Sequence, residues 1–363
     1  MTSRQSNVDS NGRHSIENPP LGLVSDCISD VFINQMSRAG QIPPAKSVFR
    51  PQDGCADVPR LDNHTDSTLN SCGMGLDIND VQLFIAARKQ GVQFGRTIMI
   101  GRNSLNVFPS AMVAILERHG LPSEKFRKAG PECAYAEPFF EALGAVRVDS
   151  LDNSDFEGAQ FIHDLNQPIP ASWKDQFDVV YDGGTLEHVF NFPTALRNCM
   201  ELLREGGRFF THTCANNLCG HGFYQFSPEL FYRALSAENG FEVERMVIHR
   251  VGPYGNWYEV SDPNAIRSRV ELITFTPMQM LVQAKRTSIK PIFARHPQQS
   301  DYTALWEASR DAQDSTNLTP VVRKPRLPAL ARFIHAMLTG LEFYRRQSLR
   351  NRRFFCKVPK ECE

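Results

Sequence analysis

Two stretches of the sequence hold most of the side chains that could carry proton transfer or polar recognition. The first follows residues 177–181 and contains Asp182, Glu187 and His188. The second follows residues 208–213 and contains His212, Asn216, Asn217, His221 and Tyr224. Carboxylates and imidazoles are the usual proton donors and acceptors in catalysis. These two stretches are therefore where we expect an active site.

The elements around these stretches form one strand-helix-strand unit. Residues 177–181 are a β-branched and aromatic run that stops at Asp182-Gly183-Gly184, which is typical of a buried parallel strand. Pro193 opens an amphipathic helix, Gly206-Gly207 is interpreted as its stop, and residues 208–213 form the next strand. Ligands bind outside the carboxyl ends of parallel strands, so both stretches should lie at that edge.

The rest of the chain repeats this alternation. Helices are predicted over 79–89, 108–119, 138–143 and 228–235, and strands over 97–100, 146–151, 159–162, 241–248 and 273–284. The alternation predicts an α/β protein with a doubly wound, mostly parallel sheet over residues 73–286. Residues 1–72 have the composition of a largely disordered segment, in which only 21–36 could form a short helix or a partner-binding segment.

Composition excludes several classes of protein. The formal net charge is zero, so no nucleic-acid partner is expected. The chain has no apolar run of membrane-spanning length and no hydrophobic signal peptide, which predicts a soluble, cytoplasmic protein. Nine cysteines without a C-x-x-C pair fit reduced thiols inside a cell. The sequence does not indicate an oligomeric state.

Residues 287–363 are interpreted as a linker followed by a basic amphipathic extension. Residues 321–363 hold eleven lysines and arginines against three glutamates, and an apolar stripe runs from Leu330 to Tyr344. A basic amphipathic helix can lie as a peripheral contact on an anionic membrane. The alternative is that it packs on its own domain or on a second subunit.

One cluster has the composition of a zinc site. His212, Cys214, Cys219 and His221 lie within ten residues, and zinc accepts two cysteines and two histidines. The same residues also fit an ordinary strand end followed by a glycine-containing turn. We therefore expect no metal.

With these residues in place, the sequence resembles class I S-adenosylmethionine-dependent methyltransferases over about residues 96–286. The resemblance rests on FDVVYDGGTLEHVFN followed by CMELLREGGRFF, a strand-ending Asp182, a helix and a Gly-Gly turn. It implies a Rossmann-like methyltransferase fold, S-adenosylmethionine as cofactor and methyl transfer as the activity.

The resemblance also implies cofactor-binding residues. In LGAVRVDSLDNS, Asp152 matches the acidic residue that holds the ribose hydroxyls better than Asp149, which would fall inside the strand. Asp164 and Leu165 match the motif with which the family contacts the adenine of the cofactor. Both aspartates would also suit a cap or a turn.

The first motif departs from the family. Where methyltransferases have G-x-G-x-G, this chain has GRNSLN, with Gly101 alone and an Arg102 that could pair with the cofactor carboxylate. Asp182 and Gly183, which begin the ligand-facing loop, complete the cofactor-binding candidates.

For catalysis, His221 is the first candidate base and Glu187-His188 the second. A loop histidine bonded to backbone and a scaffold role for Glu187-His188 are the alternatives. The expected acceptor is a hydroxyl or amine of a small-molecule or carbohydrate-like compound. The competing hypothesis, favoured by the missing glycines, is a non-catalytic protein of methyltransferase fold that binds or scaffolds, for instance in a membrane-associated glycan or lipid modification assembly.

Overall fold

The structure is a computed structural model that describes residues 75–128, 131–253, 255–313 and 329–360. The predicted disordered segment 1–72, with its candidate helix at 21–36, lies outside the described residues.

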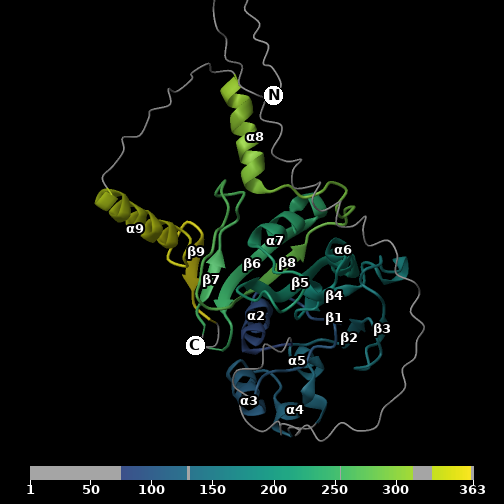
Figure 1. Ribbon diagram of the computed structural model, residues 1–363. Coiled ribbons are helices and arrows are strands. Elements are labelled where there is room, and N and C mark those ends of the chain that lie inside the picture. Colours follow the sequence, from purple (N-terminus) through teal and green to yellow (C-terminus); the bar gives the residue numbers. More distant parts are fainter. Residues whose placement is uncertain (1–74, 129–130, 254, 314–328, 361–363) are drawn as a thin grey trace, which may run out of the picture. The chain divides into compact units, whose positions relative to one another are not determined.

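A single sheet organises the described residues (Figure 1). It has nine strands in the order β3-β2-β1-β4-β5-β8-β6-β7-β9. The strands are β1 (Arg96–Ile100), β2 (Arg147–Asp152), β3 (Phe161–Ile162), β4 (Phe177–Asp182), β5 (Leu203–Asn216), β6 (Phe241–Arg250), β7 (Trp257–Val260), β8 (Met278–Arg286) and β9 (Phe355–Val358). Strands β1 to β5 are parallel, and β5 and β6 run in one direction because each is antiparallel to β8. The predicted fold class, an α/β protein with a doubly wound, mostly parallel sheet, is confirmed.

The strand order places the ligand crevice. From β1 the chain winds outward to β2 and β3 and then returns to the other side of β1 to form β4. Such a reversal is the topological switch point at which open α/β sheets bind ligands. The loops after β1 and β4 therefore form the crevice walls.

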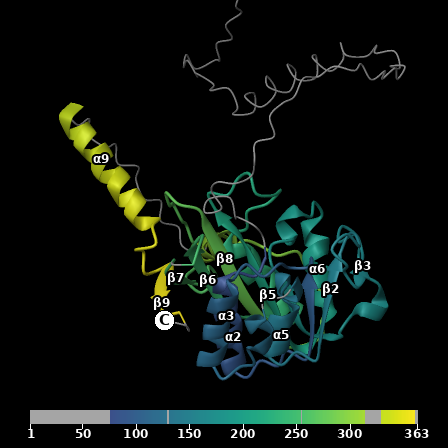
Figure 2. The ribbon, with the colours of Figure 1, turned by 90° about the horizontal axis from the view of Figure 1, so that it is seen from below.

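Helices cover both faces of the sheet because side chains along each strand alternate. Ile98, Val180 and Phe209 pack with the helices α6 (Phe192–Leu202) and α7 (Pro228–Ala234). Met99, Tyr181 and Phe210 face the helices grouped on the other side, which Figure 2 shows: α2 (Ile78–Lys89), α3 (Pro109–Arg118) and α5 (Glu137–Ala142), with the short α4 (Glu124–Arg127) nearby. Four single turns complete the described elements: η1 (Pro131–Ala134), η2 (Ala171–Trp173), η3 (Leu186–His188) and η4 (Ala237–Asn239).

The C-terminal part of the chain adds two helices and an edge strand. These are α8 (Ser300–Gln313), α9 (Ala329–Arg346) and β9, which pairs antiparallel with β7. Phe354 and Phe355 are buried in the core on the α6 face. Residues after α9 therefore pack on their own sheet, while Leu338 and Leu341 on α9 are exposed. No helix among the described residues has the length and apolar character to cross a bilayer.

The structure corrects three sequence interpretations. Gly206-Gly207 does not stop a helix; α6 ends at Leu202 and both glycines lie within β5. The strand predicted over 273–284 begins only after Pro277, at Met278, because proline cannot donate to a ladder. Strands β7 and β9 and helix α8 were not predicted from the sequence.

Candidate functional site

The loops after β1 and β4 are joined at the switch point. The hydroxyl of Thr185, in the loop after β4, donates to the carbonyl of Ile100 at 2.8 Å. Within the loop after β1, the side-chain amide of Asn103 donates to the carbonyl of Gly101 at 3.0 Å. Gly101 has φ +72, and a Cβ there would lie 2.8 Å from Thr185 Oγ1. A glycine is thus needed for the two loops to pack, whether or not a ligand lies against them.

Asp182 organises the loop after β4 from inside the protein. Its carboxylate is buried and accepts hydrogen bonds from the N–H groups of Thr185 and Leu186 and from the hydroxyl of Thr211. Burial raises the pKa of Asp182 to about 6, against the lowering by these donors. Its oxygens are thus already bonded within the protein, and its predicted contact with the cofactor stays a prediction. Its neighbour Gly183 is also buried, and a Cβ there would lie 2.0 Å from Asn103 Oδ1.

Arg102 is engaged within the protein. Its guanidinium forms an ion pair with Glu137 at 2.7 Å, donates to the carbonyl of Glu157 at 2.7 Å and lies 4.0 Å from the ring centre of Tyr135. Binding a ligand carboxylate would require Arg102 to leave or share these partners. Its predicted cofactor role stays a prediction.

Asp152 and Asp149 differ in their position on β2 and in their burial, as the register of the sequence indicates. Asp152 is the last residue of β2 and half-buried, and one of its oxygens accepts from the N–H of Ser154 at 3.3 Å. Asp149 lies within the strand, is buried, and pairs with Arg147 at 2.9 Å. Of the two, Asp152 is the carboxylate at the edge where a ligand would bind.

The turn after β3 contains the two predicted adenine-contacting residues, one exposed and one buried. Asp164 is exposed and accepts from the backbone and side-chain N–H groups of Asn166, which lower its pKa. Leu165 is buried in the core on the α6 face. Asn166 in turn accepts from the backbone N–H of Asn191 at 2.8 Å and so ties this turn to the loop after β4.

The three candidate catalytic side chains come together. Glu187 and His188 lie in η3, and the N–H of Phe223 donates to the carbonyl of Glu187 at 2.8 Å, which brings the loop after β5 over that turn. The ring centres of His188 and His221 are 5.1 Å apart, and His221 Nε2 lies 3.9 Å from Glu187 Oε1. Two loops that are distant in sequence thus build one cluster.

Burial sets the protonation of this cluster. Burial, and next the charge of Asp182, raise the pKa of Glu187 to about 7. Burial and the neighbouring His188 lower the pKa of His221 below its ordinary 6.5. At neutral pH His221 is therefore uncharged and able to accept a proton.

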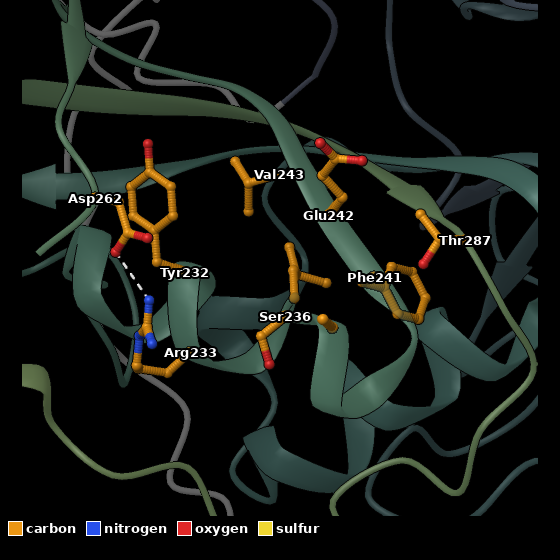
Figure 3. A pocket seen from close by; sticks show the side chains of 10 residues that line it. Tyr232, Arg233, Ser236, Phe241, Glu242, Val243, Asp262 and Thr287 are labelled. Atoms are coloured by element: carbon orange, nitrogen blue, oxygen red, sulfur yellow. Dashed lines mark hydrogen bonds and ion pairs between the residues drawn. The ribbon is translucent and has the colours of Figure 1, made fainter. Parts of the chain in front are cut away.

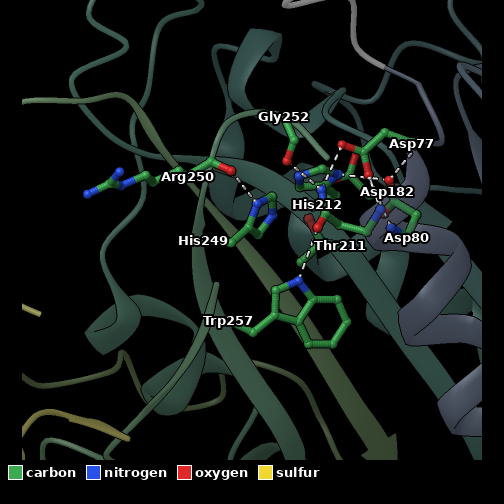
Figure 4. A network of polar contacts seen from close by, with 10 residues as sticks. Asp77, Asp80, Asp182, Thr211, His212, His249, Arg250, Gly252 and Trp257 are labelled. Atoms are coloured by element: carbon green, nitrogen blue, oxygen red, sulfur yellow. Dashed lines mark hydrogen bonds and ion pairs between the residues drawn. The ribbon is translucent and has the colours of Figure 1, made fainter. Parts of the chain in front are cut away.

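A second polar network lies on the α2 face, and the sequence interpretation missed it (Figure 4). Nδ1 of the buried His212 and Oδ2 of the buried Asp80 are 2.9 Å apart. Asp80 in turn accepts from the N–H of Asp77, the residue that caps α2. Burial lowers the pKa of His212, but the carboxylates of Asp80 and Asp77 raise it overall to about 9. The signal in the sequence was D-I-N-D at 77–80, a capping box whose second aspartate was not interpreted as a partner for a histidine.

This network separates the four residues of the cysteine-histidine cluster that has the composition of a zinc site. His212 faces α2 and pairs with Asp80, and Cys219 is exposed. The set His212, Cys214, Cys219 and His221 therefore does not converge on one point.

A separate pocket of about 370 Å³ lies near the start of β6 (Figure 3). Its walls include Tyr232 and Arg233 of α7, Phe241, Asp262 and Thr287, and Arg233 forms an ion pair with Asp262 at 2.8 Å. Because Phe241 is the first residue of β6, this pocket lies at the amino end of that strand, away from the crevice.

No protein-family model matches the chain, and a search of curated proteins finds no match. Among solved structures, one similar chain is the 1,6-didemethyltoxoflavin-N1-methyltransferase of Burkholderia thailandensis, at 15% identity over 58% of this chain and 80% of that chain, with a TM-score of 0.30. A putative S-adenosylmethionine-dependent methyltransferase from Listeria monocytogenes matches at 12% identity over 56% and 98%, with a TM-score of 0.30.

Proposed function

We propose that the chain is an S-adenosylmethionine-dependent methyltransferase that transfers a methyl group to a hydroxyl or amine of a small-molecule or carbohydrate-like acceptor. The observation that carries this proposal is the meeting of three features at one edge of the sheet. Gly101 follows β1, Asp152 ends β2, and the cluster of Glu187, His188 and His221 follows β4 and β5. This edge is where a doubly wound sheet binds nucleotides.

The residues of the crevice fit the cofactor in part. Asp152 stands at the carboxyl end of β2 with a half-buried carboxylate, and a carboxylate can accept two hydrogen bonds from the adjacent hydroxyls of a ribose. In this proposal the exposed Asp164, which follows β3 one strand farther out, would accept from the amine of the adenine. At the amino-acid end, Gly101 is the one glycine of the turn and Arg102 is already paired.

In this proposal the bound cofactor supplies a methyl group on a sulfonium for in-line displacement. The chain itself has to orient the acceptor and remove its proton. His221 suits the second task because its imidazole is neutral at pH 7 and its Nε2 faces Glu187. Glu187, buried behind it, would stabilise the imidazolium that proton transfer creates.

The test is binding of the cofactor and of its demethylated product. A ligand at about 100 times its dissociation constant adds about 2.7 kcal/mol to native stability, which raises the midpoint of a domain of this size by roughly 5 to 10 °C. Calorimetric titration of Asp152→Ala should show well over tenfold weaker binding, because two charge-assisted hydrogen bonds contribute roughly 1.5 to 3 kcal/mol each. Asp149→Ala is the matched control on the same strand and should bind normally. Absence of any midpoint shift at millimolar ligand would refute the proposal.

A second function is favoured by one observation, the engagement of Arg102 with Glu137. If that pair persists, the chain could be a non-catalytic protein of methyltransferase fold. Normal binding of the demethylated product together with no turnover on any hydroxyl or amine acceptor would support this function over catalysis.

A further inference from the structure

Three side chains of different donor type meet at the carboxyl end of β5. They are the carboxylate of Glu187, the thiol of Cys214 and the imidazole of His221. One ligand atom from each lies within 4.8 Å of the other two. Glu187 comes from the loop after β4, Cys214 from β5 itself, and His221 from the loop beyond it, so the fold and not the local sequence assembles the group.

Burial makes this group unusual. Glu187 and Cys214 are fully buried, and the His221 side chain is 13% exposed. Neither carboxylate oxygen of Glu187 has a hydrogen-bond partner of normal geometry, although the hydroxyl of Thr213 is near enough to lower the pKa of Glu187, and Nε2 of His221 has no partner. A buried carboxylate that lacks full hydrogen bonding destabilises the fold. A cation between these atoms would relieve that destabilisation.

We propose that Glu187, Cys214 and His221 bind one Zn²⁺ ion and leave a fourth position open to water or to an acceptor atom. Zinc takes thiolate, imidazole and carboxylate ligands together, and sites with three protein ligands and one open position are of the catalytic type. Two ligands at about 2.1 Å from a tetrahedral ion lie about 3.4 Å apart. The 3.9 Å between His221 Nε2 and Glu187 Oε1 is close to that separation.

Binding requires Cys214 to lose its proton. The Zn–S bond forms as the S–H bond breaks, and the proton leaves to solvent, as does any proton on Glu187. His221 binds in its neutral form and loses no proton from Nε2. Zinc affinity should therefore rise with pH, with proton release measurable on binding.

The other group of potential metal ligands does not have these properties. In the group of Asp77, Asp80 and His212, the aspartate oxygens already accept from Asn79, Asp77 and Asp80 N–H groups, and Nδ1 of His212 contacts Asp80 directly. Its atoms are bonded to one another, so an ion would have to displace these bonds.

Zinc binding can be measured without methyl transfer, but the site shares His221 and Glu187 with the proposed catalytic cluster, so a bound ion and a His221 base exclude each other. An ion on Nε2 of His221 would prevent that atom from accepting a proton. The exposed His188, whose ring centre is 5.1 Å from that of His221, would then be the nearest free imidazole for the acceptor.

The experiment uses the full chain without a histidine tag, incubated with zinc sulfate and then gel-filtered. Metal analysis should find about one zinc per chain. Cys214→Ser and His221→Ala should each reduce bound zinc to a small fraction of that amount. Cys219→Ser and His188→Ala are the matched controls, since both residues are nearby and neither belongs to the site, and both should retain zinc.

Cobalt(II) gives a second measurement that does not depend on activity or on full stability of a variant. Cobalt bound through Cys214 should show thiolate-to-metal charge-transfer absorption in the wild type and in Cys219→Ser, and none in Cys214→Ser. Equal zinc content in Cys214→Ser and Cys219→Ser, or a wild type that holds no zinc after gel filtration, would overturn the proposal.

Discussion

The ion pair of His212 and Asp80 predicts a specific dependence of stability on pH. His212 is buried, and the carboxylates of Asp80 and Asp77 raise its pKa from 6.5 to about 9. The folded chain therefore holds the imidazole proton more tightly than the unfolded chain does. Protonation stabilises the fold fully below pH 6.5, and this stabilisation is lost as the pH rises through 9.

The magnitude follows from the shift. A pKa difference of one unit corresponds to about 1.4 kcal/mol, so the shift of His212 contributes about 3 kcal/mol. Protonation of Glu187, whose pKa is raised from 4.5 to about 7, stabilises the fold fully below pH 4.5, and this stabilisation is lost as the pH rises through 7. The Glu187 contribution to stability is therefore lost at a lower pH than the His212 contribution.

Urea unfolding at pH 6.5 and 9.5 tests this prediction. The wild type should lose about 3 kcal/mol more than His212→Gln over that interval, because glutamine can donate to Asp80 but does not titrate. His296→Gln, which alters an exposed histidine, should keep the wild-type slope. Parallel pH profiles for wild type and His212→Gln would show that His212 is not charged in the folded protein.

Three further outcomes are expected. His221→Ala should lower turnover by about 100 to 10,000-fold with little change in cofactor affinity; activity within a few fold of wild type would leave His188 as the base or require none. Gly101→Ala should destabilise the fold by about 1 to 3 kcal/mol, since an L-residue is strained at φ +72 and its Cβ meets Thr185, whereas Gly220→Ala, with open space around it, should cost much less in the same denaturant titration. Leu338→Glu with Leu341→Glu, at positions 61% and 62% exposed, should leave the unfolding midpoint unchanged but weaken sedimentation with anionic liposomes; unchanged sedimentation would argue against a membrane contact by α9.

The sequence predicted the elements that are specified locally. The apolar runs that became β1, β4 and β6 are short, bounded by glycine or polar residues, and separated by helical patterns, so each can be recognised by itself. Strands β7 and β9 could not be recognised in this way, because Trp257 pairs with Val358 about a hundred residues later and each strand has only four residues. The glycines at 206 and 207 misled for a related reason. The parallel pairing of β5 with β4 extends the strand through a sequence that in isolation resembles a helix stop.

In the candidate site, too, the sequence spacing shows which residues are near one another on the chain, but only the fold shows which side chains meet. His212 and Cys214 are two residues apart on one strand, a spacing that would let both side chains face the same side of the sheet and share an ion. In the structure His212 instead pairs with Asp80. The structure resolves the cysteine-histidine pattern into two separate groups. Asp80, 132 residues earlier, pairs with His212, while Glu187 joins Cys214 and His221 from the loop after β4. Neither acidic partner belongs to the pattern, so its spacing alone could not show which side chains converge.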